Sequence, residues 1–244
     1  MDNVVVTGAS RGIGLAIAGK LAASGYCAIA VARKSGPELE AAIETARRET
    51  RGALHFAALD LADIDAIPEF VRDLRRERGP IYGLVNNAGI GTEGLLATMP
   101  TDQIEALLRL NTLSPIVLTK YVVRGMMAEG RGRIVNVSSI IASTGYNALS
   151  VYGASKAAMV GFTKSLSREV GRVGVTVNAL APGFVDTEMT RGLDDAQRKR
   201  IADRSALRRL AGVEDVAAMA AYLIGETGRN ITGAVMTVDA GATA

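Results

Sequence analysis

Tyr152 and Lys156 lie four residues apart in the segment YGASK. Residues at this spacing share one face of a helix, so the two side chains would be neighbours. A phenol can donate a proton at neutral pH, and a nearby ammonium group favours the phenolate and lowers the pKa of the phenol. Ser139 ends a predicted strand 13 residues before Tyr152, where its hydroxyl could hold an oxygen that gains negative charge. The three side chains together suit the delivery of a proton to a carbonyl oxygen.

A glycine-rich segment, Thr7–Gly14, follows the first predicted strand and opens the first predicted helix. Its glycines have the spacing G-x-x-x-G-x-G. Glycine allows a tight turn and lets a pyrophosphate approach the N–H groups at a helix N-terminus, where the helix dipole favours negative charge. The segment therefore predicts a binding site for the phosphates of a dinucleotide.

The same segment also matches G-x-S-x-G, the nucleophile elbow of serine hydrolases, with Ser10 as the nucleophile. A hydrolase triad needs a histidine, and the only one is His55, within the apolar strand Leu54–Leu59. With one histidine and one cysteine, Cys27, the chain also lacks the ligands of a Cys/His zinc site. We therefore expect neither a hydrolase nor a metal centre.

The second predicted strand ends in Val31-Ala32-Arg33, with no acidic residue at its tip. NAD-binding folds place a carboxylate there, on the ribose 2′-hydroxyl, and a carboxylate would repel a 2′-phosphate. Arg33, and Arg11 in the glycine-rich segment, could instead pair with that phosphate. This pattern predicts NADP(H) as the cofactor.

Short apolar runs alternate with longer segments of helical period, which predicts a single α/β domain over residues 1–244: a doubly wound, mostly parallel sheet with helices on both faces. Strands are predicted at Asn3–Val6, Cys27–Ala32, Ala53–Leu59, Gly83–Asn86, Arg133–Val137, Val175–Leu180 and Val235–Val238. Helices are predicted after the glycine-rich segment and at Pro37–Arg51, Asp63–Arg78, Thr101–Glu129, Val151–Arg172 and Val213–Gly225. Pro115 should break or kink the longest helix. The polar segment 187–209 is interpreted as a mobile substrate lid, with a solvated loop as the alternative.

Composition argues against several other classes of protein. The formal charge of +3 is spread among interspersed acids, and aromatic residues make up 4% with no tryptophan, so no nucleic-acid surface is expected. No apolar run approaches the roughly 18 residues of a membrane span, and the first residues do not form a signal peptide. The single cysteine fits a reducing compartment. We expect a cytoplasmic protein that binds neither nucleic acid nor membranes.

The chain resembles the short-chain dehydrogenase/reductase family from end to end, through motifs in the family's order. They are Thr7–Gly14, Asp60, Asn86-Asn87-Ala88-Gly89, Asn111, the Ser139, Tyr152 and Lys156 set, and Pro182-Gly183 with Thr187. The resemblance implies catalysis by Asn111, Ser139, Tyr152 and Lys156. For NADP(H) it implies contacts from Gly8, Ser10, Arg11, Gly12, Ile13, Gly14, Arg33, Asp60, Leu61, Asn87, Ala88, Gly89, Tyr152, Lys156, Pro182, Gly183, Val185 and Thr187.

The resemblance also implies how the parts work together. Lys156 would reach the nicotinamide ribose, and Asn111 would anchor a water that carries protons to Lys156. The strands would be ordered 3-2-1-4-5-6-7, and the protein would be a tetramer. The chemistry would be hydride transfer between NADP(H) and a carbonyl carbon.

Within the family, the chain looks most like bacterial 3-oxoacyl-[acyl-carrier-protein] reductases, which predicts a carbonyl substrate bound to acyl-carrier protein. Arg131, Arg133 and Arg172 could dock that acidic carrier. The segment Val238–Ala242 departs from the family, because it reads VDAGA where paired glycines are usual. Alternatives are another small ketone, a sugar or a cyclic alcohol as substrate. A different class is a regulator that senses NADP(H) without turnover.

Two long predicted helices carry more apolar residues than one face against a sheet can use, which predicts burial by a partner subunit. These residues are Val117, Leu118, Val122 and Val123 on the first helix and Met159, Val160, Phe162 and Leu166 on the second. Pairing of these helices across a two-fold axis would give a homotetramer built from two dimers.

Overall fold

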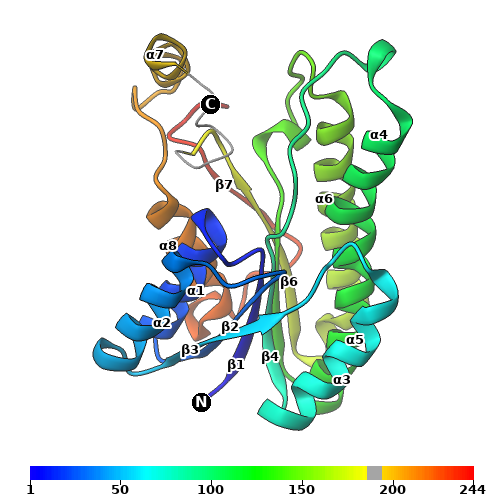
Figure 1. Ribbon diagram of the computed structural model, residues 1–244, viewed down its shortest axis with the longest axis vertical. Helices are drawn as coiled ribbons and strands as arrows, with labels where there is room; N and C mark the ends of the chain where they lie inside the picture. Colours follow the sequence, from blue (N-terminus) through cyan, green and yellow to red (C-terminus); the bar gives the residue numbers. More distant parts are fainter. Residues whose placement is uncertain (186–193) are drawn as a thin grey trace.

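A seven-stranded sheet runs through the centre of the computed structural model, which describes residues 1–185 and 194–244 (Figure 1). The strands are β1 (Asn3–Thr7), β2 (Cys27–Ala32), β3 (Ala53–Ala58), β4 (Ile81–Asn86), β5 (Gly132–Val137), β6 (Val175–Pro182) and β7 (Val235–Val238). Their order is β3-β2-β1-β4-β5-β6-β7, which confirms the predicted order, and every pair is parallel. A parallel sheet covered on both faces requires strands that are apolar on both sides, and β1, β5 and β6 are buried throughout.

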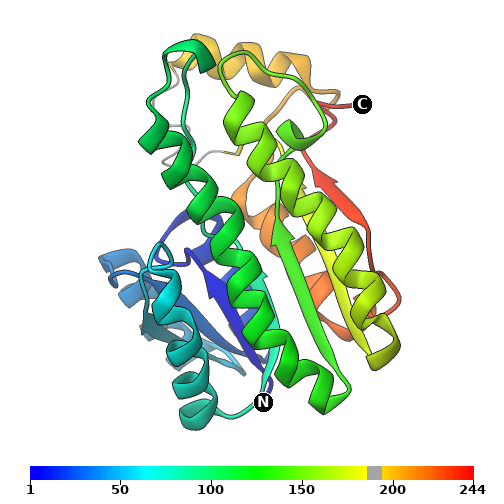
Figure 2. The same cartoon turned by 90° about the vertical axis from the view of Figure 1, so that its right-hand side faces the viewer.

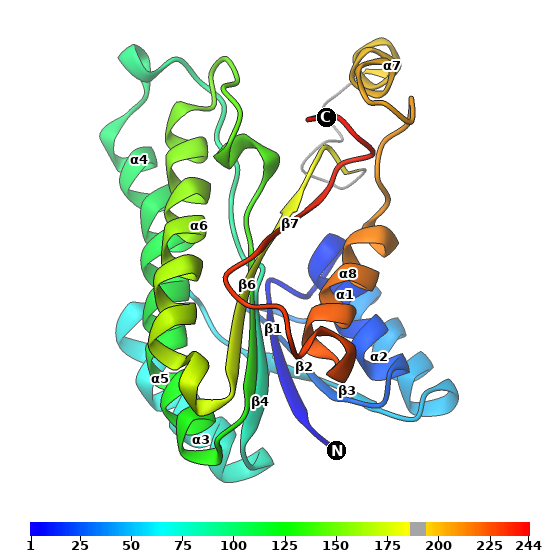
Figure 3. The same ribbon diagram turned by 180° about the vertical axis from the view of Figure 1, so that it is seen from behind.

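Helices cover both faces of the sheet, as predicted (Figures 1 and 3). One face is covered by α1 (Gly12–Ala23), α2 (Pro37–Glu49) and α8 (Val213–Ile224). The other is covered by α3 (Ile67–Arg78), α5 (Ser114–Glu129) and α6 (Ser150–Val170). Two shorter helices, α4 (Thr101–Leu108) and α7 (Asp195–Arg204), lie toward the end of the molecule where the C-terminus lies.

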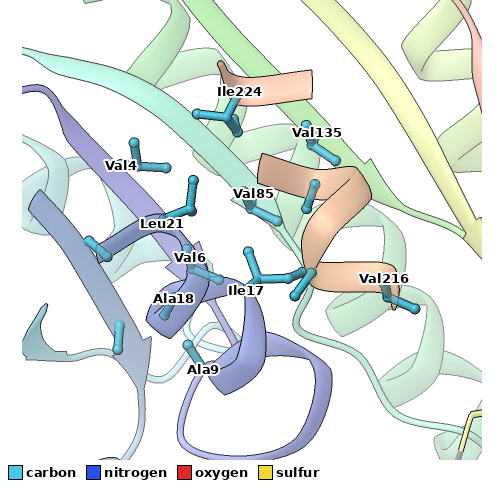
Figure 4. Packing of buried hydrophobic residues seen from close by; sticks show 14 of the residues in the cluster. Val4, Val6, Ala9, Ile17, Ala18, Leu21, Val85, Val135, Val216 and Ile224 are labelled. Carbon is cyan, nitrogen blue, oxygen red and sulfur yellow. The ribbon is translucent and has the colours of Figure 1, made fainter. Parts of the chain in front are cut away.

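The core between α1, α8 and the sheet consists of aliphatic side chains with almost no exposed surface (Figure 4). Ile17 and Leu21 lie one helical turn apart on α1 and are both fully buried. Val216 and Ile224 of α8 join them over the sheet. This packing fixes α1, and with it the glycine-rich segment at its N-terminus.

The long helix predicted at Thr101–Glu129 is interrupted earlier than Pro115. A π-helical turn, Arg109–Leu113, separates α4 from α5. Pro115 lies in the first turn of α5, where its missing N–H costs least. Turns of this kind insert one residue into a helix and occur frequently at functional sites, and this one carries Asn111.

Segment 187–209, interpreted as a lid, is only partly described: residues 187–193 lie outside the described range. Within the described part, Asp194 and Gln197 form a capping box that starts α7. Nothing in these contacts tests motion, so the lid stays a prediction. In the described residues, no helix is long and apolar enough to cross a membrane.

The prediction that the two long helices expose apolar surface is wrong for most of the residues named. Those that lie 8% exposed or less are Leu118, Val122, Val123, Met159 and Leu166. Val117 and Phe162 are partly buried and pack against the same core cluster. The prediction failed because it considered only the face of each helix that lies against the sheet. Neighbouring helices also pack against the sides of α5 and α6.

Candidate active site

Thr7 at the end of β1 fastens the glycine-rich segment to the segment after β4. Its Oγ1 accepts hydrogen bonds from the N–H groups of Asn87 (2.9 Å) and Ala88 (3.0 Å). The side-chain amide of Asn87 donates to the carbonyl oxygens of Thr7 (2.8 Å) and Gly8 (3.2 Å). The carboxyl ends of two neighbouring parallel strands are thereby joined, at the place where nucleotides bind in such sheets.

Two glycines are required for this close approach. Gly8 has φ +64°, and a Cβ there would lie 2.8 Å from the Ala88 Cα. A Cβ on Gly14 would lie 2.3 Å from the carbonyl oxygen of Gly8 and 2.5 Å from the amide nitrogen of Asn87. The side chain of Arg11, the N-cap residue of α1, makes no capping hydrogen bond to the first turn. The helix N-terminus therefore keeps N–H groups for an anion such as a pyrophosphate.

The predicted adenosine side lies around the ends of β2 and β3. Arg33 directly follows β2 and is exposed, as is Arg11. Asp60 follows β3 and accepts a hydrogen bond from the N–H of Ala62 (2.9 Å), while Leu61 is buried. The hydrogen bond that Asp60 accepts shapes the turn after β3. Arg33 is a positively charged residue at the tip of β2.

Tyr152 lies on the first turn of α6, and Ser139 follows β5. Burial raises the pKa of Tyr152, and a hydrogen bond with Ser139 lowers it by less. The oxygen of Ser139 also accepts from the N–H of Ile141 (3.2 Å). The tyrosine is thus held as a protonated phenol, next to the serine hydroxyl.

Lys156 is 5% exposed, and its Nζ donates to the carbonyl oxygen of Val137 (3.0 Å). Burial lowers the pKa of Lys156 from 10.5 to about 8. Nζ lies 5.8 Å from the centroid of the Tyr152 ring. The expectation that Lys156 lowers the pKa of Tyr152 is wrong for this arrangement, because the ammonium group is turned to a main-chain oxygen and burial of the phenol dominates.

Asn111 is 2% exposed and crosses to the segment after β4. Its Oδ1 accepts from the N–H of Ile90 (2.9 Å), and its Nδ2 donates to the Ile90 carbonyl oxygen (2.8 Å) and to Ser155 Oγ (3.2 Å). A Cβ on Gly89 would lie 3.1 Å from Asn111 Oδ1 and 3.4 Å from Lys156 Nζ. The structure therefore brings Asn111, Gly89 and Lys156 together, as the sequence predicted.

Pro182 ends β6, and Gly183 donates its N–H to the Val238 carbonyl oxygen (2.9 Å). A Cβ on Gly183 would lie 2.7 Å from the Cβ of Asp239, so the turn after β7 presses directly on this position. The carboxylate of Asp239 closes that turn by accepting from the N–H groups of Gly241 (2.8 Å) and Thr243 (2.9 Å). These hydrogen bonds lower the pKa of Asp239 although burial raises it.

Ala240, at the departure from paired glycines, has φ +55°, a conformation that glycine adopts at less cost. Val185 is 4% exposed and forms a bridge with Ala211. Thr187 lies outside the described residues.

Several residues of the site were missed or not given a role by sequence reasoning. Ser138 Oγ donates to the Lys156 carbonyl oxygen (2.9 Å), and Ser155 Oγ donates to the Tyr152 carbonyl oxygen (2.7 Å). Asn178 of β6 donates to the Ile231 carbonyl oxygen (2.7 Å). Thr7 could have been found, because it is a hydroxyl at the end of a strand. Ser138 and Ser155 belong to no sequence motif that would assign them these roles.

The hydrolase alternative finds no support. His55 lies in the middle of β3 paired with Ile29, not at the carboxyl ends of the strands, and burial lowers its pKa. Among the described residues, no group of three or more histidine, cysteine or acidic side chains could hold a metal ion.

The residues present fit a dinucleotide. A side chain in place of Gly8 or Gly14 would clash with neighbouring atoms, so the glycines leave room for a ligand to approach the backbone. The N-terminus of α1 offers N–H groups, and Lys156 is a buried cation. Gly8, Gly12, Gly14 and the N-terminus of α1 would hold the pyrophosphate, and Lys156 would hold the nicotinamide ribose.

Comparison with known proteins identifies the family of the chain. The family model described as "short chain dehydrogenase" matches residues 2–198. The 3-oxoacyl-[acyl-carrier-protein] reductases FabG of Escherichia coli (strain K12) and Vibrio harveyi are 38% and 40% identical to the chain, over 97% of it and 95% of each relative.

Solved structures show the same arrangement. A gluconate 5-dehydrogenase from Burkholderia cenocepacia J2315 in complex with NADP and tartrate has a TM-score of 0.91 and 30% identity, over 99% of this chain and 95% of that one. A blue fluorescent protein from a metagenomic library in complex with NADPH has a TM-score of 0.91 and 34% identity, over 100% of this chain and 98% of that one.

We predict that Lys156→Met raises the stability of the protein at pH 7. The pKa of Lys156 is about 8 in the folded chain and 10.5 as the ordinary value, a difference that corresponds to roughly 3 kcal/mol. Because the unfolded chain binds the proton more tightly, wild-type stability rises with pH between about 8 and 10.5, and the full penalty of burial is present below 8. After loss of the hydrogen bond to Val137, the variant should gain about 2 kcal/mol at pH 7.

Urea unfolding of both proteins from pH 6.5 to 10.5 measures this gain. Lys120→Met, at an exposed position of α5, is the control and should show no such pH dependence. A Lys156→Met gain that does not shrink above pH 8 contradicts the assignment of the penalty to a buried charge.

Proposed function

Because the chain belongs to the short-chain dehydrogenase family, a family of oxidoreductases, we propose that it reduces a 3-oxoacyl group bound to acyl-carrier protein, with NADPH as the reductant. The observation that carries this proposal is the similarity to FabG reductases, which reaches 40% identity over 97% of the chain. The site supports it, since a proton donor, a second hydroxyl and a buried lysine lie at the end of the sheet where the cofactor would bind.

We propose a role for each candidate catalytic side chain. Bound NADPH supplies hydride to the carbonyl carbon. Ser139 holds the carbonyl oxygen as its negative charge grows, and Tyr152 donates its phenolic proton to that oxygen. Lys156 binds the nicotinamide ribose and replenishes the proton, and Asn111 fixes the segment after β4 beside Lys156.

The pKa of Tyr152 favours the direction of reduction. A raised pKa keeps the phenol protonated near neutral pH, as a proton donor requires. Oxidation of the alcohol needs the phenolate, so it would become efficient only at higher pH or after Lys156 approaches the phenol oxygen more closely.

NADP(H) is favoured over NAD(H) by the charge at the tip of β2. Arg33 is exposed there, and no carboxylate occupies the strand end to repel a 2′-phosphate. Both structural neighbours described above contain NADP or NADPH, which supports the same choice.

Other substrates of the family are a second candidate, since one structural neighbour is a gluconate 5-dehydrogenase. That neighbour is 30% identical to the chain, against 38% and 40% for the FabG relatives. A sugar acid would need polar partners at the mouth of the site. The loops there expose Leu95, Leu96 and Tyr146, beside polar side chains such as Glu93, Ser143 and Asn147.

Docking of the acidic carrier fits Arg172 best among the three arginines named from the sequence. The side chain of Arg133 is 9% exposed, lies 5.6 Å from the Tyr82 ring centroid and pairs with Glu226, so it is not available. The side chain of Arg131 is 52% exposed, but it pairs with Asp2 and lies 4.6 Å from the same ring centroid. Arg172 is exposed at the amino end of β6, opposite to Tyr152. A carrier docked there would deliver its acyl group to the site of another subunit. An antiparallel pairing of helices across a two-fold axis would bring that site near.

A homotetramer is supported by surfaces other than those named from the sequence. Leu108, Leu113 and Met127 are 39%, 44% and 43% exposed along α4, the π-helical turn and α5. On α8 and β7, Tyr222 and Val235 are 42% and 39% exposed. Two such apolar surfaces suit the two kinds of two-fold contact in a tetramer that is a dimer of dimers. Segment 187–209 is proposed as the lid of a single catalytic domain.

NADPH-dependent turnover of acetoacetyl and longer 3-oxoacyl thioesters tests the proposed function. We expect turnover, with Tyr152→Phe losing at least about 100-fold in kcat while NADPH affinity changes little, because only the transferable proton is removed. Tyr222→Phe, which removes a hydroxyl far from the strand ends, should behave as wild type. Absence of turnover with every carbonyl compound would favour a sensor of NADP(H), and near-normal turnover by Tyr152→Phe would rule out the proton donor.

The cofactor assignment predicts that Arg33→Asp lowers the ratio of kcat/KM for NADPH to that for NADH by at least about tenfold, or about 1.4 kcal/mol. The variant loses a charge-assisted bond to the 2′-phosphate and gains the acid that NAD prefers. Arg47→Asp, at an exposed position of α2, is the matched control. A wild-type protein that already prefers NADH refutes the assignment.

The assembly predicts that Met127→Asp dissociates the tetramer, because an apolar contact would have to bury a carboxylate. Light scattering should give roughly four times 25.4 kDa for the wild type and a smaller mass for the variant. Ala41→Asp, on the exposed side of α2, should stay tetrameric. A wild-type protein that is monomeric and fully active would contradict the predicted tetramer.

A further inference from the structure

Apolar side chains are exposed at the end of the molecule that carries Tyr152, and the mechanism does not use them. Leu95 and Leu96, before α4, are 60% and 58% exposed, and Tyr146, before α6, is 47% exposed. Water-exposed leucines and tyrosines gathered in one place mark sites where an apolar ligand binds. The two loops lie side by side (Figure 2), since the N–H of Gly94 donates to the Ala148 carbonyl oxygen (3.0 Å).

The turn that carries Tyr146 is built on the same helical turn as Tyr152. The N–H of Leu149 donates to the Tyr146 carbonyl oxygen (3.3 Å), and the N–H of Gly153 donates to the Leu149 carbonyl oxygen (2.7 Å). Tyr146 therefore has a fixed position relative to the first turn of α6, where the reaction takes place.

The ring of Tyr146 reaches the segment after β6. Its centroid lies 5.9 Å from that of Phe184, with an angle of 56° between the rings. Phe184 follows Gly183, the residue on which the turn after β7 presses. The two rings thus join the loops after β5 and β6, on either side of the expected place of the nicotinamide.

Backbone strain marks the same turn. Ala148 has φ +64°, a conformation that non-glycine residues adopt only at a cost in free energy. Such strain persists only where surrounding contacts hold it, and it is frequent at functional sites. Here the strained residue supplies the carbonyl oxygen that accepts from Gly94, so it fixes Tyr146 and the loop with Leu95 against each other.

We propose that Tyr146 is a specificity-determining residue, which together with Phe184 forms an apolar wall for the acyl chain of a 3-oxoacyl substrate. Leu95 and Leu96 extend this wall away from Tyr152, so substrates longer than acetoacetyl bury additional methylene groups on it. The inference rests on the proposed function and adds a chain-length preference to it. Each methylene buried on the wall raises kcat/KM about fourfold.

The test compares kcat/KM for the acetoacetyl and 3-oxooctanoyl thioesters of N-acetylcysteamine with NADPH. Wild type should prefer the octanoyl compound. Tyr146→Ala should lower the ratio of kcat/KM for the 3-oxooctanoyl thioester to that for the acetoacetyl thioester by about tenfold. Its kcat/KM for the acetoacetyl thioester should stay within about twofold of wild type. Tyr146→Phe should keep the ratio, because the ring and not the hydroxyl forms the wall, and Tyr146→Gln should lose it.

Arg47→Ala, at an exposed position of α2, is the control and should leave the ratio unchanged. An equal loss for both thioesters in Tyr146→Ala would mean that Tyr146 only supports α6, and it would overturn the inference. An unchanged ratio would overturn it as well while leaving the proposed function intact. A wild-type protein that reduces neither thioester would overturn both.

Discussion

The hydrogen bond from Lys156 Nζ to the Val137 carbonyl oxygen is the contact on which the site depends. It places an ammonium group in the interior, with no carboxylate partner among the residues that the structure describes, which is costly because burial disfavours the charged form. The cost can be sustained only if α6 is held firmly against β5. Ser138 holds it there by donating to the main-chain oxygen of Lys156 itself. The same strand end therefore fixes both ends of the lysine residue, its main chain and its ammonium group.

A buried polar network extends this rigidity through the middle of the sheet. Asn86 of β4 donates to Asn136 Oδ1 of β5 (2.8 Å) and to Thr119 of α5 (2.9 Å), and Asn136 donates to Thr163 of α6 (2.8 Å). Buried polar groups generally need partners, and these hydrogen bonds form in one register only, although Asn86 Oδ1 has no partner among the described residues. The network therefore sets α5 and α6 relative to the strands that end at the site. Asn111, in the π-helical turn before α5, and Tyr152, at the start of α6, take their places from it.

The sequence predicted the strands closely because buried parallel strands are continuous apolar runs, as at Cys27–Ala32, whose bounds match the structure. The order of the strands came from the family resemblance, since periodicity carries no information on neighbours. The π-helical turn was not predicted, because it arises from the contacts of Asn111 with Ile90 and not from any local pattern. The expected lowering of the pKa of Tyr152 was wrong for a similar reason. Spacing on a helix gives proximity to Lys156, but it gives neither burial nor the direction in which the ammonium group points.

The packing of α1 against α8 also has consequences for how the protein folds. These helices come from opposite ends of the chain, and β1 acquires its second neighbour, β4, only after β2 and β3. Contacts between distant segments slow folding, because the entropy of loop closure is lost before the contacts form. Until α8 arrives, α1 can pack only against the strands and α2, and the surface of α1 that later meets α8 stays exposed, which favours aggregation. The nucleotide-binding loop is thus encoded among the first residues but gains its full support only when one of the last helices has formed.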